Sequence, residues 1–365
     1  MIKLGRQVAC IFVLILIAGT TKAQFTETRE FRKRFAVHAE TSIEITNKYG
    51  KIEFVTWNKD SVVIEVKMKV EEKKLNRLDK TLDNIDFDFT SSSHYLIVRT
   101  IADKNRSQLE SEFLKFKETL LQTDGSIEID YKVWLPATNP LKVENKFGDI
   151  YIDDYNGPVE INLSNGKLKA HDLKKRSTIN LNFADASINS MPNGRITTNY
   201  SDFYLKTTKN LRISSKSSEI EIIEAGSLIL DSRRDQYRLR MADQVEAEAS
   251  FTSFRLNQLT DRGTFRFSYG DLELEKVAAD FTDLYIDSKN TDVSLYFNPE
   301  SAFNFEITAT KTDVTLGRDI EAESKDYINE KDDTREIKGY VNKKTTGKRK
   351  LLINATSGKV GIFSH

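Results

Sequence analysis

The pattern of apolar and polar positions repeats every 17 or 18 residues between Leu141 and Leu274. The repeated segments are KFGDIYI (146–152), SNGKLKA (164–170), NFADASI (182–188), NYSDFYL (199–205), KSSEIEI (216–222), RRDQYRL (233–239), SFTSFRL (250–256) and SYGDLEL (268–274). We take the fourth residue of each segment as its anchor; the anchors are Asp149, Lys167, Asp185, Asp202, Glu219, Gln236, Ser253 and Asp271. A fixed period in this range is typical of stacked repeat proteins.

Three columns of this alignment are apolar throughout: six residues before the anchor, one after it and three after it. A small or turn-prone residue precedes each anchor. This alternation predicts two short strands joined by a tight turn, with alternate side chains pointing inward. The chain is therefore predicted to be all-β: a parallel β-solenoid with two sheets, built from stacked coils of about 17–21 residues. The same columns extend the array to anchors at Lys51, Asp292, Asp313 and Lys359.

The chain divides into a region at 24–140 that opens the solenoid and the solenoid repeat domain at 141–365. In the first region, alternation with period two predicts strands, which fall at 42–54, 62–70, 94–100 and 126–135. Apolar residues at helical spacing predict two helical insertions near the N-terminus, one over Glu71–Ile85 and one over Ser107–Leu121.

A charged insertion at 318–350 interrupts the solenoid domain. Lys, Arg, Asp and Glu occur throughout it, which is typical of a long hairpin or a mobile loop. The repeat pattern returns once more at Ser357–Ile362. The last coil is therefore expected to resume the array after this insertion.

Residues 1–23 have the layout of a secretory signal peptide: Lys3 and Arg6, then an apolar run over 8–18, then small residues before Gln24. The apolar run is short for a membrane span, so cleavage is favoured over a signal anchor. Export to the periplasm or the cell surface is predicted, with no transmembrane segment in the mature chain. Cleavage would remove Cys10, the only cysteine, so the mature chain would have no disulfide.

The charge balance changes little with this cleavage. The full chain has 55 basic and 55 acidic residues, and residues 1–23 include three basic residues and no acidic one. The slight acidic excess that remains does not favour nucleic acid or an anionic membrane as a partner.

The anchor column is acidic at seven of the repeats: Asp149, Asp185, Asp202, Glu219, Asp271, Asp292 and Asp313. Stacked carboxylates at turns could bind calcium between coils, as in glycine-rich repeats of nine residues. This chain lacks that glycine pattern, and the column is interrupted by Lys167, Gln236, Ser253 and Lys359. Turn capping is the favoured interpretation, and no cofactor is expected, with calcium kept as the minor alternative.

Aromatic residues recur two positions before the anchor, at Tyr49, Phe147, Phe183, Tyr200, Phe251 and Tyr269. These rings either form an exposed stripe or fold over the edge of the core, and the second interpretation is favoured. Two residues after the anchor, the outward row Tyr204, Glu221, Arg238, Arg255, Glu273 is expected to form cross-coil ion pairs, Glu221 with Arg238 and Arg255 with Glu273. The candidate binding surface comprises Phe147, Phe183, Tyr200, Tyr204, Arg238, Phe251, Arg255 and Tyr269.

No catalytic motif supports an enzyme. The histidines are scattered, at His38, His94, His171 and His365, and the chain contains no HExxH, GxSxG or P-loop segment. A cysteine nucleophile would also be absent after signal cleavage. We therefore expect a non-enzymatic protein without a catalytic or metal site.

Three segments of the sequence carry a family resemblance: Tyr49–Ile52, Val143–Ile150 and Asn354–Val360. Together with the columns they resemble the bacterial β-strand-repeat family that bears the name putative adhesin, a domain of unknown function. The resemblance covers the chain from about residue 36 to its end. It implies an exported solenoid of the cell envelope, implies adhesion by name alone, and brings no catalytic residues with it.

These observations predict an exported, non-enzymatic β-solenoid that acts as an adhesin-like binding or scaffolding module of the bacterial cell envelope. Its partner would be an envelope protein or a glycan, because stacked coils offer a rigid, extended surface to such ligands. Two alternatives stay open: a polysaccharide-active β-helix enzyme, and a purely structural envelope protein.

Overall fold

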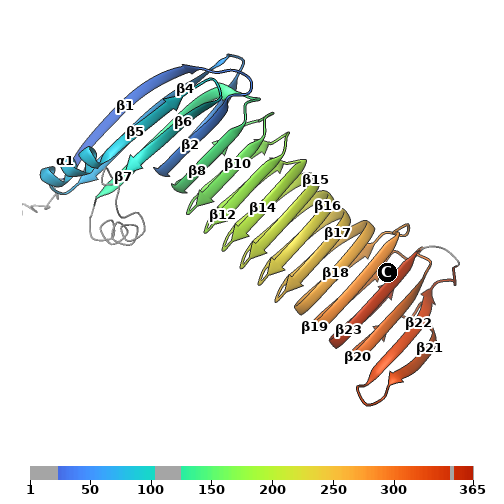
Figure 1. Cartoon of the computed structure of the whole chain (residues 1–365). Coiled ribbons are helices and arrows are strands. Elements are labelled where there is room, and N and C mark those ends of the chain that lie inside the picture. The colour runs from blue at the N-terminus through green and yellow to red at the C-terminus, as the bar shows by residue number, and fades with distance from the viewer. Residues whose placement is uncertain (1–23, 103–124, 346–348, 365) are drawn as a thin grey trace, which may run out of the picture.

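The computed structural model describes residues 24–102, 125–345 and 349–364. The predicted signal peptide and the predicted helix at Ser107–Leu121 lie outside these residues. Within the three described ranges, no helix combines the length and the apolar character that a membrane crossing requires. The structure is all-β, with one short helix among the described residues and a long, mostly parallel sheet (Figure 1).

The elements follow in chain order: β1 (Phe25–Ala36), β2 (Ser42–Tyr49), β3 (Ile52–Trp57), β4 (Ser61–Glu72), α1 (Leu75–Asn84), β5 (Ile85–Ser91), β6 (Tyr95–Ala102), β7 (Ser126–Pro136), β8 (Leu141–Phe147), β9 (Ile150–Ile152), β10 (Val159–Ser164), β11 (Lys167–Asp172), β12 (Ser177–Asn182), β13 (Asp185–Ser190), β14 (Asn193–Asn199), β15 (Asp202–Lys216), β16 (Glu219–Arg233), β17 (Gln236–Ser250), β18 (Ser253–Val277), β19 (Asp283–Phe297), β20 (Phe303–Leu316), β21 (Ile320–Asn329), β22 (Thr334–Val341) and β23 (Lys350–Ser364).

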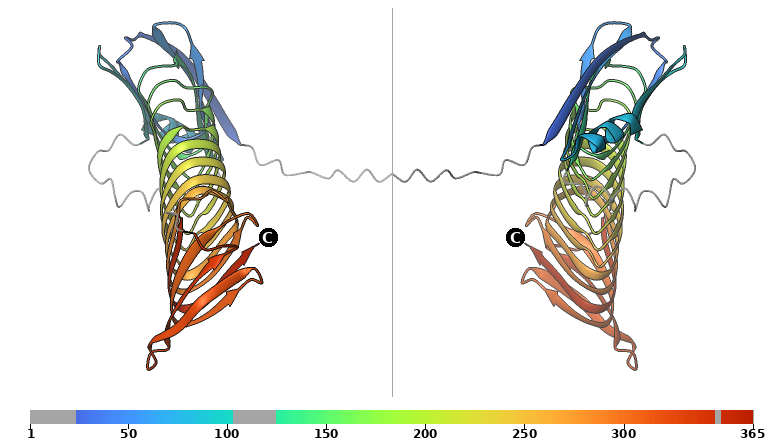
Figure 2. Two further views of the ribbon diagram at one scale, coloured as in Figure 1. Left: turned by 90° about the vertical axis from the view of Figure 1, so that its right-hand side faces the viewer. Right: turned by 90° about the vertical axis from the view of Figure 1, so that its left-hand side faces the viewer.

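Like positions of successive repeats pair in parallel and in register, as the columns predict. The residues before the turn form one stack, in which Ile161 pairs with Ile179 and Ile179 with Ile196. The residues after the turn form a second stack, in which Leu168 pairs with Ala186. We call these the first-strand and second-strand stacks. Figure 2 shows the repeated units closely superposed along the length of the molecule.

The core is the space between the two stacks, and the three apolar columns fill it. Ile179, Ile196 and Leu205 have no exposed surface, and the same holds for most members of their columns. Val314 and Leu316 are only half-buried, because they belong to the last unit of the second-strand stack and have no neighbour beyond. Burial of apolar surface, repeated unit by unit, thus holds the array together.

The tight turn between the stacks explains the column of small residues. A Cβ atom on Gly166 would lie 2.1 Å from the carbonyl oxygen of Gly148, and one on Gly270 would lie 2.1 Å from that of Thr252. Successive turns therefore stack backbone on backbone, and bulk at this position is excluded. Backbone hydrogen bonds also join neighbouring turns, such as that from Tyr200 N to Lys216 O at 2.9 Å.

At the N-terminal end, spatial order departs from chain order. Strands β6 and β7 lie outside β2 and β3, in parallel with them, and β4 then pairs antiparallel with β7. Strands β1 and β5 form the outer edges, and neither strand was predicted. The predicted first helix is confirmed as α1, which buries Leu78 and Leu82 and leaves Leu75 exposed.

At the C-terminal end, β23 pairs in parallel with both β19 and β20 and so lies between them (Figure 1). The last repeat of the sequence is therefore not the last unit of the stack, in contrast to the expected order. The charged segment contains an antiparallel hairpin, β21 with β22, whose second strand pairs with β20. The hairpin interpretation of this segment is confirmed.

Candidate binding surface

The aromatic residues before the turn are mostly on the surface. Exposed fractions are 62% for Phe183, 50% for Tyr200, 53% for Phe251 and 48% for Tyr269. The favoured interpretation, that the turn folds these rings over the core, is wrong for these four. Phe147 is exposed to 36%, and of the six aromatic positions only Tyr49 is buried. We call this position of the repeat the turn column.

The exposed rings stack in pairs. The ring centroids of Phe183 and Tyr200 lie 5.0 Å apart at an interplanar angle of 4°, and those of Phe251 and Tyr269 lie 4.9 Å apart at 6°. Phe147 stacks on Tyr49 instead, with centroids 5.8 Å apart. Each ring covers one face of its partner, so ring edges and outer faces remain open to a ligand.

The backbone at these rings has positive φ, which L residues with a Cβ avoid. The φ angles are 50° at Phe183, 51° at Tyr200, 55° at Phe251 and 56° at Tyr269. Each such residue costs about 1–3 kcal/mol, whereas a stacked aromatic pair returns only about 0.5–1.5 kcal/mol. Asparagine tolerates this conformation more readily and occurs at the same turn at Asn165. Folding stability therefore does not explain aromatics here.

Two polar residues separate the aromatic pairs. Ser217 and Arg234 occupy the turn column between Tyr200 and Phe251, and both also have positive φ. The guanidinium carbon of Arg234 lies 5.9 Å from the ring centroid of Phe251, within range of a cation–π interaction. The column thus presents an aromatic pair, a polar step and a second aromatic pair along one edge of the stack.

The outward row lies on the second-strand stack, and both of its arginines form ion pairs. Arg255 Nη2 contacts Glu273 Oε2 at 2.7 Å, as expected, and the Glu273 carboxylate raises the pKa of Arg255. Arg238 lies beside Glu221 in the strand register but pairs with Glu219. The expected pairing of Arg238 with Glu221 is therefore replaced by a contact to the acidic anchor. The arginines of this row offer less free positive charge than the sequence suggested.

Tyr204 and Phe147 belong to different parts of the surface. Tyr204 belongs to the outward row and lines a depression of about 430 Å³, together with Tyr151 and His171. Phe147 belongs to the turn column, but Asn165 separates it from Phe183. The predicted set thus falls into two exposed aromatic pairs, one outward row and one detached ring.

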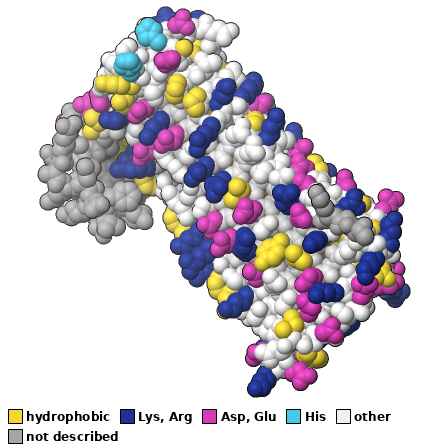
Figure 3. Space-filling model, turned by 45° about the vertical axis from the view of Figure 1, so that its right-hand side comes forward, with side chains coloured by type: hydrophobic (Ala, Val, Ile, Leu, Met, Phe, Trp, Pro, Cys, Tyr) yellow, Lys and Arg dark blue, Asp and Glu magenta, His cyan; other side chains and the backbone are white. Residues whose placement is uncertain are grey.

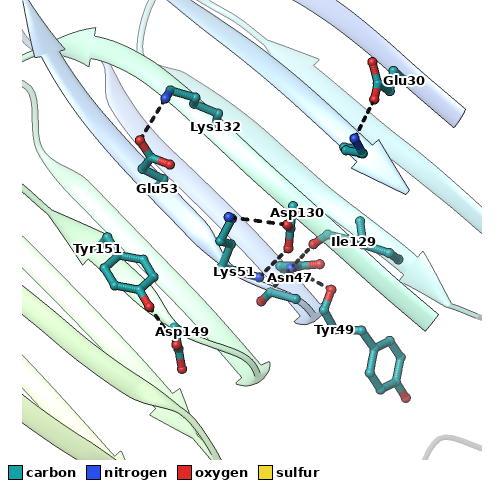
Figure 4. Close-up of polar contacts among 12 residues, drawn as sticks. Glu30, Asn47, Tyr49, Lys51, Glu53, Ile129, Asp130, Lys132, Asp149 and Tyr151 are labelled. Atoms are coloured by element: carbon teal, nitrogen blue, oxygen red, sulfur yellow. Dashed lines mark hydrogen bonds and ion pairs between the residues drawn. The ribbon is translucent and has the colours of Figure 1, made fainter. Parts of the chain in front are cut away.

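Acidic anchors cap the turn of the neighbouring unit where that unit has a lysine anchor. The backbone N–H groups of Lys167 and Lys359 donate to the anchor carboxylates of Asp149 and Asp292, at 2.9 and 3.1 Å. The N–H of Lys51 donates in the same way to Asp130, which precedes the residue of β7 that pairs with Ile52. Figure 4 shows Asp130 beside Lys51, and Asp149 accepting a hydrogen bond from Tyr151. Turn capping is confirmed at these positions.

Asp202 sits within a run of three acidic anchors. Partial burial raises its pKa, and the neighbouring carboxylates of Asp185 and Glu219 add to that effect. Each of these neighbours has a cation of its own, since Lys167 lies 3.7 Å from Asp185 and Arg238 pairs with Glu219. Repulsion within the run is thus concentrated on its central member.

One group of potential metal ligands occurs among the described residues: Asp154, His171 and Asp172. Their ligand atoms lie within 4.8 Å of one another, and His171 Nδ1 contacts Asp154 Oδ1. The hydrogen bond with Asp154 raises the pKa of His171 and lowers that of Asp154. The residues appeared unrelated in sequence, although Asp154 and His171 are one repeat apart.

A cationic surface on the other stack was missed. A hollow of about 650 Å³, here called the basic hollow, is lined by Lys174, Lys175, Arg176, Asn193, Gly194, Arg195, Asn210, Leu211, Arg212, Ser227 and Ile229. Arg195 and Arg212 are 17 residues apart, so the repeat period could have revealed them. On the face seen in Figure 3, basic and acidic side chains are interspersed.

Comparison with known proteins finds similarity to bacterial proteins described as adhesins, at very low identity. A putative cell adhesion protein from Clostridium sporogenes matches with 10% identity and a TM-score of 0.22, over 93% of this chain and 100% of its own. A putative adhesin from Parabacteroides distasonis matches with 9% identity and a TM-score of 0.31, over 92% and 97%. No family model and no curated protein matches. Scores this low carry no argument about what the chain binds.

Proposed function

We propose that this chain is a non-enzymatic β-solenoid that acts as an adhesin-like binding or scaffolding module, exported to the bacterial cell envelope. The layout of residues 1–23 supports export. The parallel stacks support a rigid surface along which a ligand contacts several units at once. The proposal requires no cofactor, and the partner is an envelope protein or a glycan.

The two exposed aromatic pairs of the turn column carry this proposal. They combine large apolar rings, solvent exposure and a backbone conformation that costs free energy. Aromatic side chains that are exposed at a cost to stability are typical of binding surfaces, where a partner covers them. Asn165 occupies the same turn position with the same sign of φ, so the fold does not require an aromatic residue there.

The geometry of the pairs defines how a partner would contact them. Stacking leaves the outer faces of Phe183 and Tyr200 and the edges of all four rings accessible. A sugar ring can pack on an outer face, and an apolar side chain can pack along the edges. The polar step of Ser217 and Arg234 would supply hydrogen bonds between the two aromatic contacts.

The test measures binding of the full mature chain to an array of envelope glycans and to envelope protein extracts separated by mass. Tyr200→Asn and Tyr269→Asn remove one ring of each pair while keeping a residue that tolerates positive φ. Tyr327→Asn is the matched control, because Tyr327 is exposed to 58% on the C-terminal hairpin. Arg255→Ala tests the outward row.

The expected result is that the two turn-column variants lose at least about tenfold in affinity, as for removal of an aromatic contact of about 1.4 kcal/mol or more. The Tyr327 variant should bind as the unmodified chain does. Unchanged binding by both turn-column variants would remove this surface as the binding site. A chain that binds no glycan and no envelope protein would favour a purely structural role.

A further inference from the structure

The basic hollow lies on the first-strand stack, away from the outward row. Its cations come from three neighbouring units: Lys174, Lys175 and Arg176 precede β12, Arg195 lies in β14 and Arg212 in β15. All five side chains are exposed. The 17-residue repeat therefore gathers five positive charges at the mouth of one depression.

Folding alone does not account for this charge. Arg195 and Arg212 are directly opposite each other on adjacent parallel strands, an arrangement of like charges that is destabilising. Neither arginine forms an ion pair with any described residue. Elsewhere on the first-strand stack, Arg266 is 3.8 Å from Glu246 on the adjacent unit, which shows how the array can balance such a charge.

The lining around the arginines favours a particular class of anion. Asn210 Nδ2 donates to Asn193 Oδ1 at 3.0 Å, and this leaves amide groups on both residues, with Ser227 nearby, for further hydrogen bonds. No aromatic side chain lines the hollow. Single-stranded nucleic acids bind proteins largely by stacking bases on aromatic rings, so the lining does not suit them. Carboxylates flanked by hydroxyl groups suit it well, because guanidinium forks bind carboxylates and amides bind hydroxyls.

We infer that the basic hollow binds an acidic polysaccharide, with uronic-acid carboxylates at Arg195 and Arg212 and sugar hydroxyls at Asn193 and Asn210. The site is separate from the turn column and does not depend on the function proposed for it. Because the hollow is open and its arginines follow the stacking direction, the polysaccharide would run along the units and contact successive repeats.

The test uses the full mature chain and oligogalacturonate of defined length, with binding followed by calorimetry at low and at physiological salt. The double variant Arg195→Gln with Arg212→Gln removes the central charges. The control, Arg240→Gln with Arg318→Gln, removes the same charge from exposed sites outside the hollow. Both proteins are checked for an unchanged melting temperature; the first should gain stability, if anything, because it relieves the repulsion.

We expect the hollow variant to lose at least about tenfold in affinity, since it removes two charge-assisted contacts to the ligand, while the control keeps its affinity. Added salt should weaken binding, and fully methyl-esterified oligogalacturonate should not bind. Equal loss in the two variants would overturn the assignment, since it would indicate non-specific attraction. Tighter binding of single-stranded DNA or of poly-glutamate at equal charge, or absence of oligogalacturonate binding, would overturn it as well.

Discussion

The regular array and the two ends of this molecule are built from the same repeat but are connected differently. In the array, each unit pairs with the unit 17 or 18 residues away, as Ile179 does with Ile196. At the ends, strands pair across much longer separations: β2 pairs with β8, with Ile43 opposite Leu141, and β19 pairs with β23, with Ile286 opposite Ile353. Chain order and spatial order coincide only in the array.

This difference predicts different folding behaviour. Pairs of adjacent units close short loops, and each closure costs little chain entropy. The ends must bring distant segments together, and β19 and β20 gain their full set of partners only once β23 lies between them. We infer that the array can form unit by unit, whereas the C-terminal end forms as one cooperative piece.

The largest expected effect comes from removing the last strand. A chain that ends at Thr345 lacks β23 and with it five buried apolar side chains: Leu351, Ile353, Ala355, Val360 and Ile362. At about 1.5–3 kcal/mol for each large apolar side chain, β20 and the hairpin should lose their native packing. Hydrogen exchange should show β20 unprotected, with β10 to β14 protected as in the full chain.

The matched control for that truncation is the deletion of one complete period from the array. Deleting residues 219–235 joins Ser218 to Gln236 and keeps every column in phase. Because repeat proteins lose stability roughly one unit at a time, this chain should still fold with a cooperative transition. If this deletion of one period and the truncation at Thr345 disrupt folding equally, the contrast between array and end fails.

A single substitution in one column provides the next test. Leu205 and Leu316 both stand three residues after an anchor, but Leu205 is fully buried and Leu316 is half-buried at the end of its stack. Leu205→Ala should cost about 2–5 kcal/mol of unfolding free energy, and Leu316→Ala about half as much or less. Urea unfolding of both variants measures the two costs; equal costs would mean that the end is packed as tightly as the array.

A substitution in the turn column should change the unfolding free energy less, and the size of that change tests whether the exposed ring serves the fold. Tyr200→Asn relieves backbone strain and loses one stacked pair, so the change in unfolding free energy should lie within about 1 kcal/mol of zero. Tyr237→Asn, at a fully buried ring of the core, should cost about 3–5 kcal/mol. Thermal unfolding distinguishes the two. A large destabilisation by Tyr200→Asn would show that the exposed ring serves the fold, and would weaken the proposed binding role.

Sequence periodicity predicted the array because apolar columns report inward-facing positions directly. Ile161, Ile179 and Ile196 keep one phase over the whole array, and only parallel stacking in register accounts for this. The place of β23 could not be predicted, since a repeat unit presents the same columns whichever two units it lies between. Strand β1 was missed because its residues are largely exposed and lack a clear apolar alternation.

The sequence identified the residues of the candidate surface, but it did not show which of them are exposed or how they pair. The aromatic recurrence was visible, but the exposure of Phe183 and Tyr200 depends on a positive φ at the turn, which the residue types do not reveal. Arg238 was identified, yet its partner is Glu219, because a long side chain reaches a diagonal neighbour as easily as the direct one. The basic hollow was missed because its arginines were not aligned as a column.

The smallest effect concerns a side-chain contact between adjacent units of the array, His171 with Asp154. The hydrogen bond and charge of Asp154 raise the pKa of His171, and those of His171 lower the pKa of Asp154. The histidine contribution to stability is thus fully present below its unfolded pKa of about 6.5 and is lost as pH rises through the raised folded pKa. The aspartate contribution is present above its unfolded pKa and is lost as pH falls through the lowered folded pKa.

Both side chains are exposed, so we expect the pair to affect proton binding measurably and global stability very little. An NMR titration of the His171 ring should show its pKa falling in Asp154→Asn, and falling less in Asp172→Asn, whose effect on His171 is the weaker. Equal shifts in the two variants would mean that the local acidic environment, and not the specific contact between units, sets the pKa of His171. In that case this side-chain contact would not help to specify how adjacent units align, and the apolar columns of the core alone would determine the register.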